Sequence, residues 1–166
     1  MFSQSLFYSP SRGQLSFEEM LEDLLAYIRE KPEKSYEVIV GCDSSSSDTP
    51  EFPLAVVVLR TGQGGRFFLK KIAYPDRRFV GWKTRILQEV LLSCDLALTL
   101  KEELKRRTEE CDFPRYQFRY IHADVGGNGQ TQEMIKEVVG IIRGNGFEPK
   151  IKPESFAASN VADRYT

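Results

Sequence analysis

Three apolar segments follow one another with only short polar links, and this succession is the strongest constraint on the fold. Residues 36–43 (YEVIVGCD), 54–60 (LAVVVLR) and 66–74 (RFFLKKIAY) have the length and the β-branched or aromatic composition of strands. The links at 44–50 (SSSSDTP) and 61–65 (TGQGG) consist of turn residues and are short. We therefore expect a meander of three antiparallel strands.

Helical and strand patterns alternate after this meander. Residues 83–107 place apolar side chains on one broad helical face, and residues 131–146 form a second helical pattern that ends in GNG, a left-handed capping signal. Strands are predicted at 116–124 and 148–152, and a final helix follows Pro153. The order βββαβαβα predicts an α/β protein with a mixed five-stranded sheet flanked by helices.

The chain before the first strand predicts an irregular or hairpin lead-in followed by one more helix. Ser16 and Glu19 have the S-x-x-E spacing of a capping box, and apolar residues recur at helical spacing over residues 17–30. The length of 166 residues suffices for one core rather than two. We expect residues 1–34 to form a lead-in and an extra helix that pack on a single domain of residues 35–166.

Composition excludes several classes of protein. Apolar residues make up 41% and charged residues 28% of the chain, as in ordinary globular proteins. No apolar run reaches membrane-spanning length, and the N-terminus lacks the features of a secretory signal, so no membrane partner is expected. The three cysteines form no CxxC pair and fit no zinc pattern, which favours a reducing, cytoplasmic location.

Charge is unevenly distributed along the chain. The net charge of −1 argues against a protein that coats nucleic acid through bulk charge. Residues 66–85, however, hold seven bases and one acid, with Tyr74, Phe79 and Trp82 among them. Such a segment could track a phosphate backbone. The simpler interpretation is a solvated strand edge on which Lys and Arg block aggregation.

Two acids stand at the ends of predicted strands. Asp43 ends the first strand, and Asp124 ends the fourth, shortly before the glycine-rich turn GGNGQT. In open α/β sheets the reactive site lies beyond the carboxyl ends of strands, and these two strands can be neighbours in mid-sheet. Two adjacent acids repel each other unless a cation lies between them, and Mg2+ prefers oxygen ligands.

Two further acids could complete such a site. Glu89 falls on the margin of the apolar face of the helix at 83–107, and Asp163 follows a run of small residues in the last helix. Each acid also has a simpler interpretation, as a turn former, a cap of the glycine turn, a surface acid or a solvated residue near the chain end. The predicted catalytic and metal-binding set, able to hold two Mg2+ or Mn2+ ions about 4 Å apart for phosphodiester hydrolysis, is Asp43, Glu89, Asp124 and Asp163.

Polar residues near these acids are candidates for catalysis and substrate binding. His122 lies two residues before Asp124, so both side chains are expected on one face of the sheet. The imidazole could be a metal ligand or a general base, and the alternative is a half-buried histidine with a satisfied hydrogen bond. Lys152 could hold a phosphate or stabilise the charge of the transition state. The predicted substrate-binding residues are Ser45, Asn128, Lys152 and Ser159.

A family resemblance is carried by three stretches of sequence: VIVGCDSS (38–45), HADVGGNGQTQEMIKEVVGIIRGNGF (122–147) and IKPESFAASNVADRYT (151–166). They are similar to the YkuK-like family of bacterial proteins, a ribonuclease H-like group without an assigned activity. The resemblance covers most of the chain and implies a ribonuclease H-like fold. Active nucleases of that class carry acids on the first strand, the first helix, the end of the fourth strand and the last helix. The corresponding positions here look like Asp43, Glu89, Asp124 and Asp163.

The sequence leaves the function open between two main hypotheses. The first is a Mg2+-dependent nuclease acting on RNA, an RNA–DNA hybrid or branched DNA. The second is a catalytically silent ribonuclease H-like module that binds nucleic acid or a protein through the basic segment. A third, a phosphotransfer relative, is faintly suggested by GCDSSSS and DVGGNGQT, but that class needs two such domains around a nucleotide. No oligomeric state is predicted.

Overall fold

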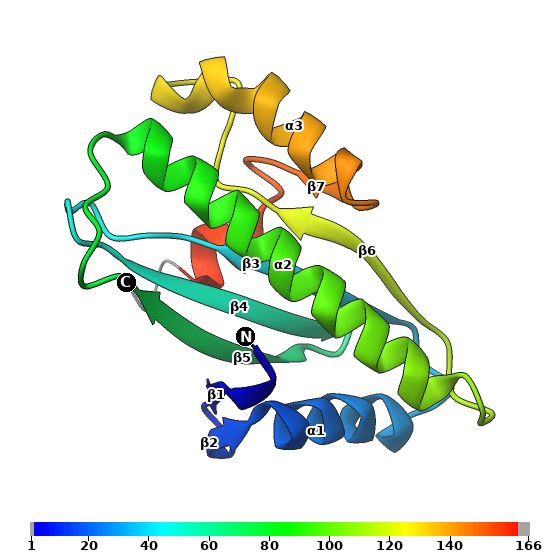
Figure 1. Ribbon diagram of the computed structural model, residues 1–166. Coiled ribbons are helices and arrows are strands. Elements are labelled where there is room, and N and C mark those ends of the chain that lie inside the picture. The colour runs from blue at the N-terminus through cyan, green and yellow to red at the C-terminus, as the bar shows by residue number, and fades with distance from the viewer. Residues whose placement is uncertain (1, 163–166) are drawn as a thin grey trace.

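A seven-stranded mixed sheet forms the frame of the protein, of which the computed structural model describes residues 2–162 (Figure 1). The strands lie in the order β2-β1-β5-β4-β3-β6-β7. Their bounds are β1 (Leu6–Ser9), β2 (Gly13–Ser16), β3 (Tyr36–Cys42), β4 (Glu51–Arg60), β5 (Gly65–Ala73), β6 (Tyr116–His122) and β7 (Glu148–Lys150). The helices are α1 (Phe17–Glu30), α2 (Trp82–Thr108) and α3 (Ile135–Gly144), with the short 3-10 segments η1 (Phe2–Gln4) and η2 (Gln130–Met134) and the π-helical segment η3 (Ala157–Ala162).

The central strands follow the predicted meander. β3 pairs antiparallel with β4, and β4 pairs antiparallel with β5, which confirms the three-stranded arrangement. β4 is buried over most of its length, so its continuous apolar run reflects a strand covered on both faces. β6 pairs parallel with β3, and β7 pairs parallel with β6. The helix predicted at 131–146 begins as the 3-10 turn η2 and continues as α3.

The sheet is larger than predicted, and the expectation of five strands was wrong. The N-terminal lead-in forms the hairpin of β1 and β2, which joins the sheet where Tyr8 pairs with Leu69 of β5. Each hairpin strand has only four residues, with Phe7 and Leu15 as its buried apolar side chains. The hairpin alternative for the lead-in is therefore the one observed, but so few positions give no measurable two-residue period, so the sequence pattern did not predict that these strands join the sheet.

All three α-helices pack on one face of the sheet. Their buried side chains form one continuous core with strand residues such as Val38, Val40 and Val56. In Figure 1, α2 crosses the sheet diagonally, and η3, drawn in red, lies on the other side of the strands. There Ala157 packs against Ile39 of β3 in a separate small cluster. Within residues 2–162, no helix combines the length and the apolar character that crossing a membrane requires.

Helix α1 coincides with the range predicted from the capping box. The Ser16 hydroxyl accepts a hydrogen bond from the Glu19 N–H at 3.1 Å, and the Glu19 carboxylate accepts one from the Ser16 N–H at 3.0 Å. The buried face of α1 belongs to the same core as α2 and α3. The division into residues 1–34 and 35–166 stays a prediction.

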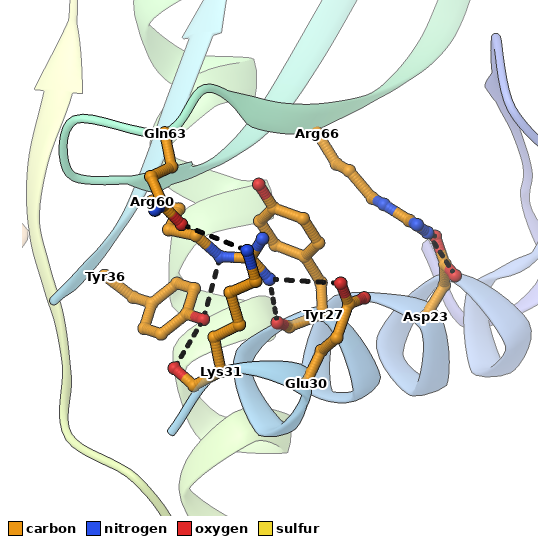
Figure 2. A network of polar contacts seen from close by, with 8 residues as sticks. All are labelled: Asp23, Tyr27, Glu30, Lys31, Tyr36, Arg60, Gln63 and Arg66. Atoms are coloured by element: carbon orange, nitrogen blue, oxygen red, sulfur yellow. Dashed lines mark hydrogen bonds and ion pairs between the residues drawn. The ribbon is translucent and has the colours of Figure 1, made fainter. Parts of the chain in front are cut away.

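A buried arginine ties α1 to the β4–β5 hairpin, as Figure 2 shows. The Arg60 guanidinium donates hydrogen bonds to the Tyr36 hydroxyl and to the Tyr27 carbonyl, both at 2.9 Å. The same guanidinium lies 4.0 Å from the centre of the Tyr27 ring. Beside it, Arg66 pairs with the buried Asp23 of α1. These contacts fix α1 near the N-terminal end of β3, the end opposite Asp43.

Candidate active site

A cavity of about 190 Å³ opens at the edge of the sheet where β3 and β6 end. Its walls come from the loop after β3, the first turns of α2, the segment after β6 and the segment after β7. The lining residues are Asp43, Ser44, Ser46, Trp82, Arg85, Ile86, Glu89, Asp124, Gln130, Thr131 and Lys152. Three acids and two bases therefore meet in one small space.

Sheet topology brings Asp43 and Asp124 to the same edge. β3 and β6 are parallel neighbours, with Gly41 beside His122 as the last pair in register. Asp43 follows β3 directly, and Asp124 lies two residues after β6. Asp43 is 9% exposed, whereas Asp124 is half-buried. The predicted adjacency of the two strands is confirmed, while a role for these acids as metal ligands remains a proposal.

Glu89 reaches the cavity from α2. It is only 6% exposed, and the Ser44 hydroxyl donates a 2.5 Å hydrogen bond to its Oε1. Burial raises the pKa of Glu89 well above its ordinary value, and the nearby charges of Asp43 and Asp124 act in the same direction. The hydrogen bond from Ser44 opposes this shift. The cavity thus holds a carboxylate that is costly to ionise without a nearby cation.

Lys152 brings a positive charge next to these acids. Its Nζ lies 3.4 Å from Oδ1 of Asp124. The Lys152 N–H donates a 2.8 Å hydrogen bond to the Val125 carbonyl, which fixes the base of the side chain. A Cβ on Gly126 would lie only 3.0 Å from Cβ of Lys152. The missing side chain at Gly126 therefore leaves the room through which the lysine approaches Asp124.

Two of the predicted residues, Ser45 and Asn128, do not line the cavity, and the side chains of two others lie outside the described part of the chain. The Ser45 hydroxyl accepts a 3.2 Å hydrogen bond from the Glu51 N–H and does not line the cavity. Asn128 is exposed in the turn after β6 and is likewise absent from the lining. Asp163 and the side chain of Ser159 lie outside the described residues.

His122 packs on the face of the sheet opposite α2. Its Nδ1 accepts a 3.2 Å hydrogen bond from the Ala157 N–H, and its ring lies edge-on to Phe156 at 4.8 Å. The residue is 1% exposed. Burial, with a smaller contribution from the charge of Lys150, lowers the pKa of His122 to about 4. These contacts favour a structural role over the predicted general base: Nδ1 is hydrogen-bonded, as in the half-buried histidine weighed above, while the buried Nε2 has no hydrogen-bond partner among the described residues.

Sequence reasoning did not select Ser44 or Thr131, and it named Trp82 and Arg85 only as part of the basic segment 66–85, not as neighbours of the acids. Trp82 and Arg85 lie seven and four residues before Glu89 on α2, so helical periodicity counted back from Glu89 would have pointed to both. Ser44 stands beside the predicted Ser45, and no sequence pattern separates the two. The Thr131 hydroxyl accepts a 3.1 Å hydrogen bond from the Gly126 N–H, which closes the glycine-rich turn.

The donor set has the chemistry of a site for a hard divalent cation. Carboxylate and hydroxyl oxygens are the ligands that Mg2+ and Mn2+ prefer. In the part of the chain from residue 2 to 162, no group of three or more His, Cys, Asp or Glu side chains stands close enough to hold a metal ion. Ser44 engages Glu89, and Lys152 engages Asp124. The types of ligand atom in the cavity suit such a cation. A bound cation would compete with Lys152 for Asp124.

Comparison with known sequences defines the class of the protein. The sequence model of the Ribonuclease H-like family matches residues 19–166, and the chain belongs to that family. The chain is also similar over its full length to the protein of Bacillus subtilis (strain 168) named "Uncharacterized protein YkuK". The two are 31% identical over 175 residues, an alignment that covers 100% of this chain and 99% of the relative. No solved structure matches the chain significantly.

These findings confirm the resemblance inferred from the three sequence stretches. The family match begins within α1 and takes in most of that helix. The description of α1 as an addition to the family fold therefore stays a prediction. The mixed sheet and its helices are consistent with a ribonuclease H-like fold.

Proposed function

We propose that the cavity is the active site of a divalent-metal-dependent nuclease that hydrolyses phosphodiester bonds in RNA, an RNA–DNA hybrid or branched DNA. The observation that carries the proposal is the meeting of Asp43, Glu89 and Asp124 in a cavity that Arg85 and Lys152 also line. Phosphodiester hydrolysis needs anionic ligands for a metal and cationic groups for the phosphate, and both kinds are present. Membership of the Ribonuclease H-like family adds support.

Asp43 and Asp124 are the proposed principal holders of Mg2+ or Mn2+, with Glu89 as a third oxygen ligand. Asp163, predicted from sequence as a fourth, belongs to the same proposal. When bound, such an ion supplies activation of the attacking water and stabilisation of the leaving oxygen. The hydrogen bond from Ser44 orients the Glu89 carboxylate toward the cavity.

Lys152 and Arg85 are proposed to bind the phosphate. Lys152 stands at Asp124, and its ammonium can turn to a phosphate oxygen once a metal ion neutralises that carboxylate. Arg85 lines the cavity one helical turn before Glu89 and forms no ion pair with any acid in the described part of the chain. A guanidinium in that position offers paired donors to two phosphate oxygens.

The proposal is tested by metal-dependent cleavage of labelled RNA, RNA–DNA hybrid and branched DNA. We expect turnover with Mg2+ or Mn2+, and loss of at least about a hundredfold in Asp124→Asn, because a metal ligand is removed at nearly constant shape. Asp95→Asn, at an exposed position on α2, is the matched control and should keep full activity. If none of the three substrates is cut, or if Asp124→Asn is as active as the wild type, the nuclease proposal is wrong.

A catalytically silent binding module is the second candidate. It is favoured by the ion pair between Lys152 and Asp124, which partly neutralises that one acid without a metal. Such a module would bind nucleic acid with strong salt dependence and show no metal-dependent turnover. Binding and cleavage measured on the same substrate separate the two candidates.

A further inference from the structure

The segment between β5 and α2 borders the cavity and continues into its wall. Residues 77–85, here called the lip, contain four bases and no acid. Trp82 and Arg85 of the lip line the cavity itself. Other bases of the segment 66–85 are used elsewhere in the sheet: Arg66 pairs with Asp23, and Lys71 pairs with Glu51. Of the bases in residues 66–85, Arg85 lines the cavity, and Arg77, Arg78 and Lys83 lie in the residues just before it.

The lip is held in place by one deeply buried aromatic side chain. Phe79 is fully buried, and its ring lies 5.0 Å from that of Phe52 and 5.6 Å from that of Tyr74. Its N–H donates a 2.8 Å hydrogen bond to the Asp48 carbonyl, in the loop that follows Asp43. The lip thus has a defined shape before any ligand arrives, which lowers the entropy cost of binding.

Apolar surface is displayed on this lip. Val80 is 75% exposed, more than any other large apolar side chain in the described residues, although it is adjacent to the fully buried Phe79. Trp82 packs partly against the core and lines the cavity, and the Lys83 Nζ lies 5.6 Å from the centre of its ring. An aromatic ring and an exposed apolar side chain beside a polar cavity suit the face of an unpaired nucleobase.

The charges of the lip are available to phosphate. Arg78 pairs with Asp48 at 2.8 Å and Lys83 pairs with Glu133 at 2.9 Å, but all four side chains are more than half exposed. Exposed pairs of this kind are worth little and yield readily to a phosphate. The Arg77 guanidinium lies 4.4 Å from the centre of the Phe79 ring, a stacked position that leaves its donors free of an acid in the described residues.

We propose that the lip binds a single, unpaired nucleic-acid strand and leads it to the carboxylates. Bases lie against Trp82 and Val80, and phosphates lie against Arg77, Arg78 and Arg85. The inference rests on the proposed function and narrows its substrates to nucleic acids with an unpaired strand, which excludes a fully paired RNA–DNA hybrid. A duplex hides its base faces and could use only the arginines, so the apolar part of the lip selects for unpaired nucleotides.

The single tryptophan of the chain reports directly on this contact. Emission of Trp82 is followed while an oligothymidylate of about ten nucleotides, a length typical of single-strand sites, is added in EDTA. The same titration is made with a blunt duplex of equal length. We expect quenching by the single strand and at least tenfold weaker binding of the duplex. Unchanged emission on binding of a labelled strand, or equal affinity for the duplex, would overturn the inference.

Arginine variants test the phosphate contacts. The double variant Arg77→Ala/Arg78→Ala should weaken single-strand binding about tenfold and lower the magnitude of the slope of log affinity against log salt by about 1.4, since each phosphate contact to a single strand contributes about 0.7. Lys105→Ala/Arg106→Ala, which removes two exposed bases at the far end of α2, is the matched control and should change neither quantity. Equal losses in the two double variants would show bulk charge rather than a lip site and would contradict the proposal.

Cleavage is measured separately with Mg2+, so the two proposals fail independently. If the single strand quenches Trp82 but no cleavage occurs, the nuclease proposal is wrong and the proposal that the lip binds a single strand still stands. Cleavage without quenching of Trp82 contradicts the proposal that the lip binds the strand and leaves the nuclease proposal standing.

Discussion

The hydroxyl of Ser44 donates a 2.5 Å hydrogen bond to Oε1 of Glu89 and so joins the end of β3 to α2. The bond holds a nearly inaccessible carboxyl group beside Asp43. Because burial and then the charge of Asp43 raise the pKa of Glu89, the folded protein binds a proton there more tightly than the unfolded chain does. Stability in the absence of metal must therefore depend on pH.

Replacing Glu89 by Gln should stabilise the metal-free protein at alkaline pH. With the folded pKa above the ordinary value of 4.5, stability is highest below that value and falls as pH rises through the folded pKa. Gln keeps the shape and loses the charge, so Glu89→Gln should have the higher free energy of unfolding at pH 8 in EDTA, measured with urea. Glu102→Gln, exposed on the same helix, is the control. A wild type that is the more stable of the two at pH 8 would contradict the expected linkage.

The single histidine should remain neutral in mild acid. The pKa of His122 is lowered to about 4 from 6.5, so the unfolded chain binds more protons between these values, and stability is lost as pH falls through that range. The difference corresponds to as much as about 3 kcal/mol. Proton NMR of the one imidazole should show no titration above about pH 5. Urea unfolding of His122→Asn should lose this part of the pH dependence, and an imidazole that titrates near 6.5 would refute the prediction.

Two neighbouring glycines should respond differently to alanine. A Cβ at Gly126 would lie 3.0 Å from Cβ of Lys152, whose backbone is fixed by its bond to Val125, whereas a Cβ at Gly127 would meet nothing within 4 Å. We expect Gly126→Ala to lower the free energy of unfolding by about 1–2 kcal/mol. Gly127→Ala, the matched control, should change it by no more than about 1 kcal/mol in either direction. Thermal and urea unfolding measure the stability of both variants. Equal effects would contradict the prediction and would mean that Lys152 moves aside without cost.

Arg60 should be far more important for stability than an exposed arginine. It is 5% exposed, and removing its guanidinium leaves the Tyr27 carbonyl and the Tyr36 hydroxyl without this donor. Arg60→Leu should cost about 3 kcal/mol. Arg106→Leu, an exposed position on α2, should change stability by no more than about 0.5 kcal/mol. Urea unfolding provides the comparison, and similar losses in both variants would mean that the network in Figure 2 contributes little.

The fold could be predicted where burial leaves a pattern. β4 and β3 are covered on both faces, so their apolar runs identified them directly, and the parallel pairing that puts Asp43 near Asp124 followed from the order of the elements. For β1 and β2 the sequence offered a hairpin as one alternative but not their place in the sheet, because strands of four residues carry too few positions for periodicity.

The site could be predicted only in part, because side-chain direction depends on where an element stops. β6 ends at His122, so the alternation of strand faces does not extend to Asp124, and the two side chains do not share a face as expected. Ser45 was predicted at the site, but its neighbour Ser44 lines the cavity, because adjacent residues in this loop point in different directions. Glu89 lies at the edge of the apolar face of α2, and from such a position the sequence alone does not define whether the side chain points to the sheet or to solvent.

The strands that carry the residues of the cavity differ in how many backbone hydrogen bonds hold them. Asp43 follows a strand of seven residues that is hydrogen-bonded to neighbours on both sides, whereas Lys152 follows β7, three residues at the rim of the sheet. Segments with so few backbone hydrogen bonds open first in the native state. The backbone amides of β7 are therefore expected to exchange with solvent before those of β3, so the lysine side of the cavity rests on the less protected strand.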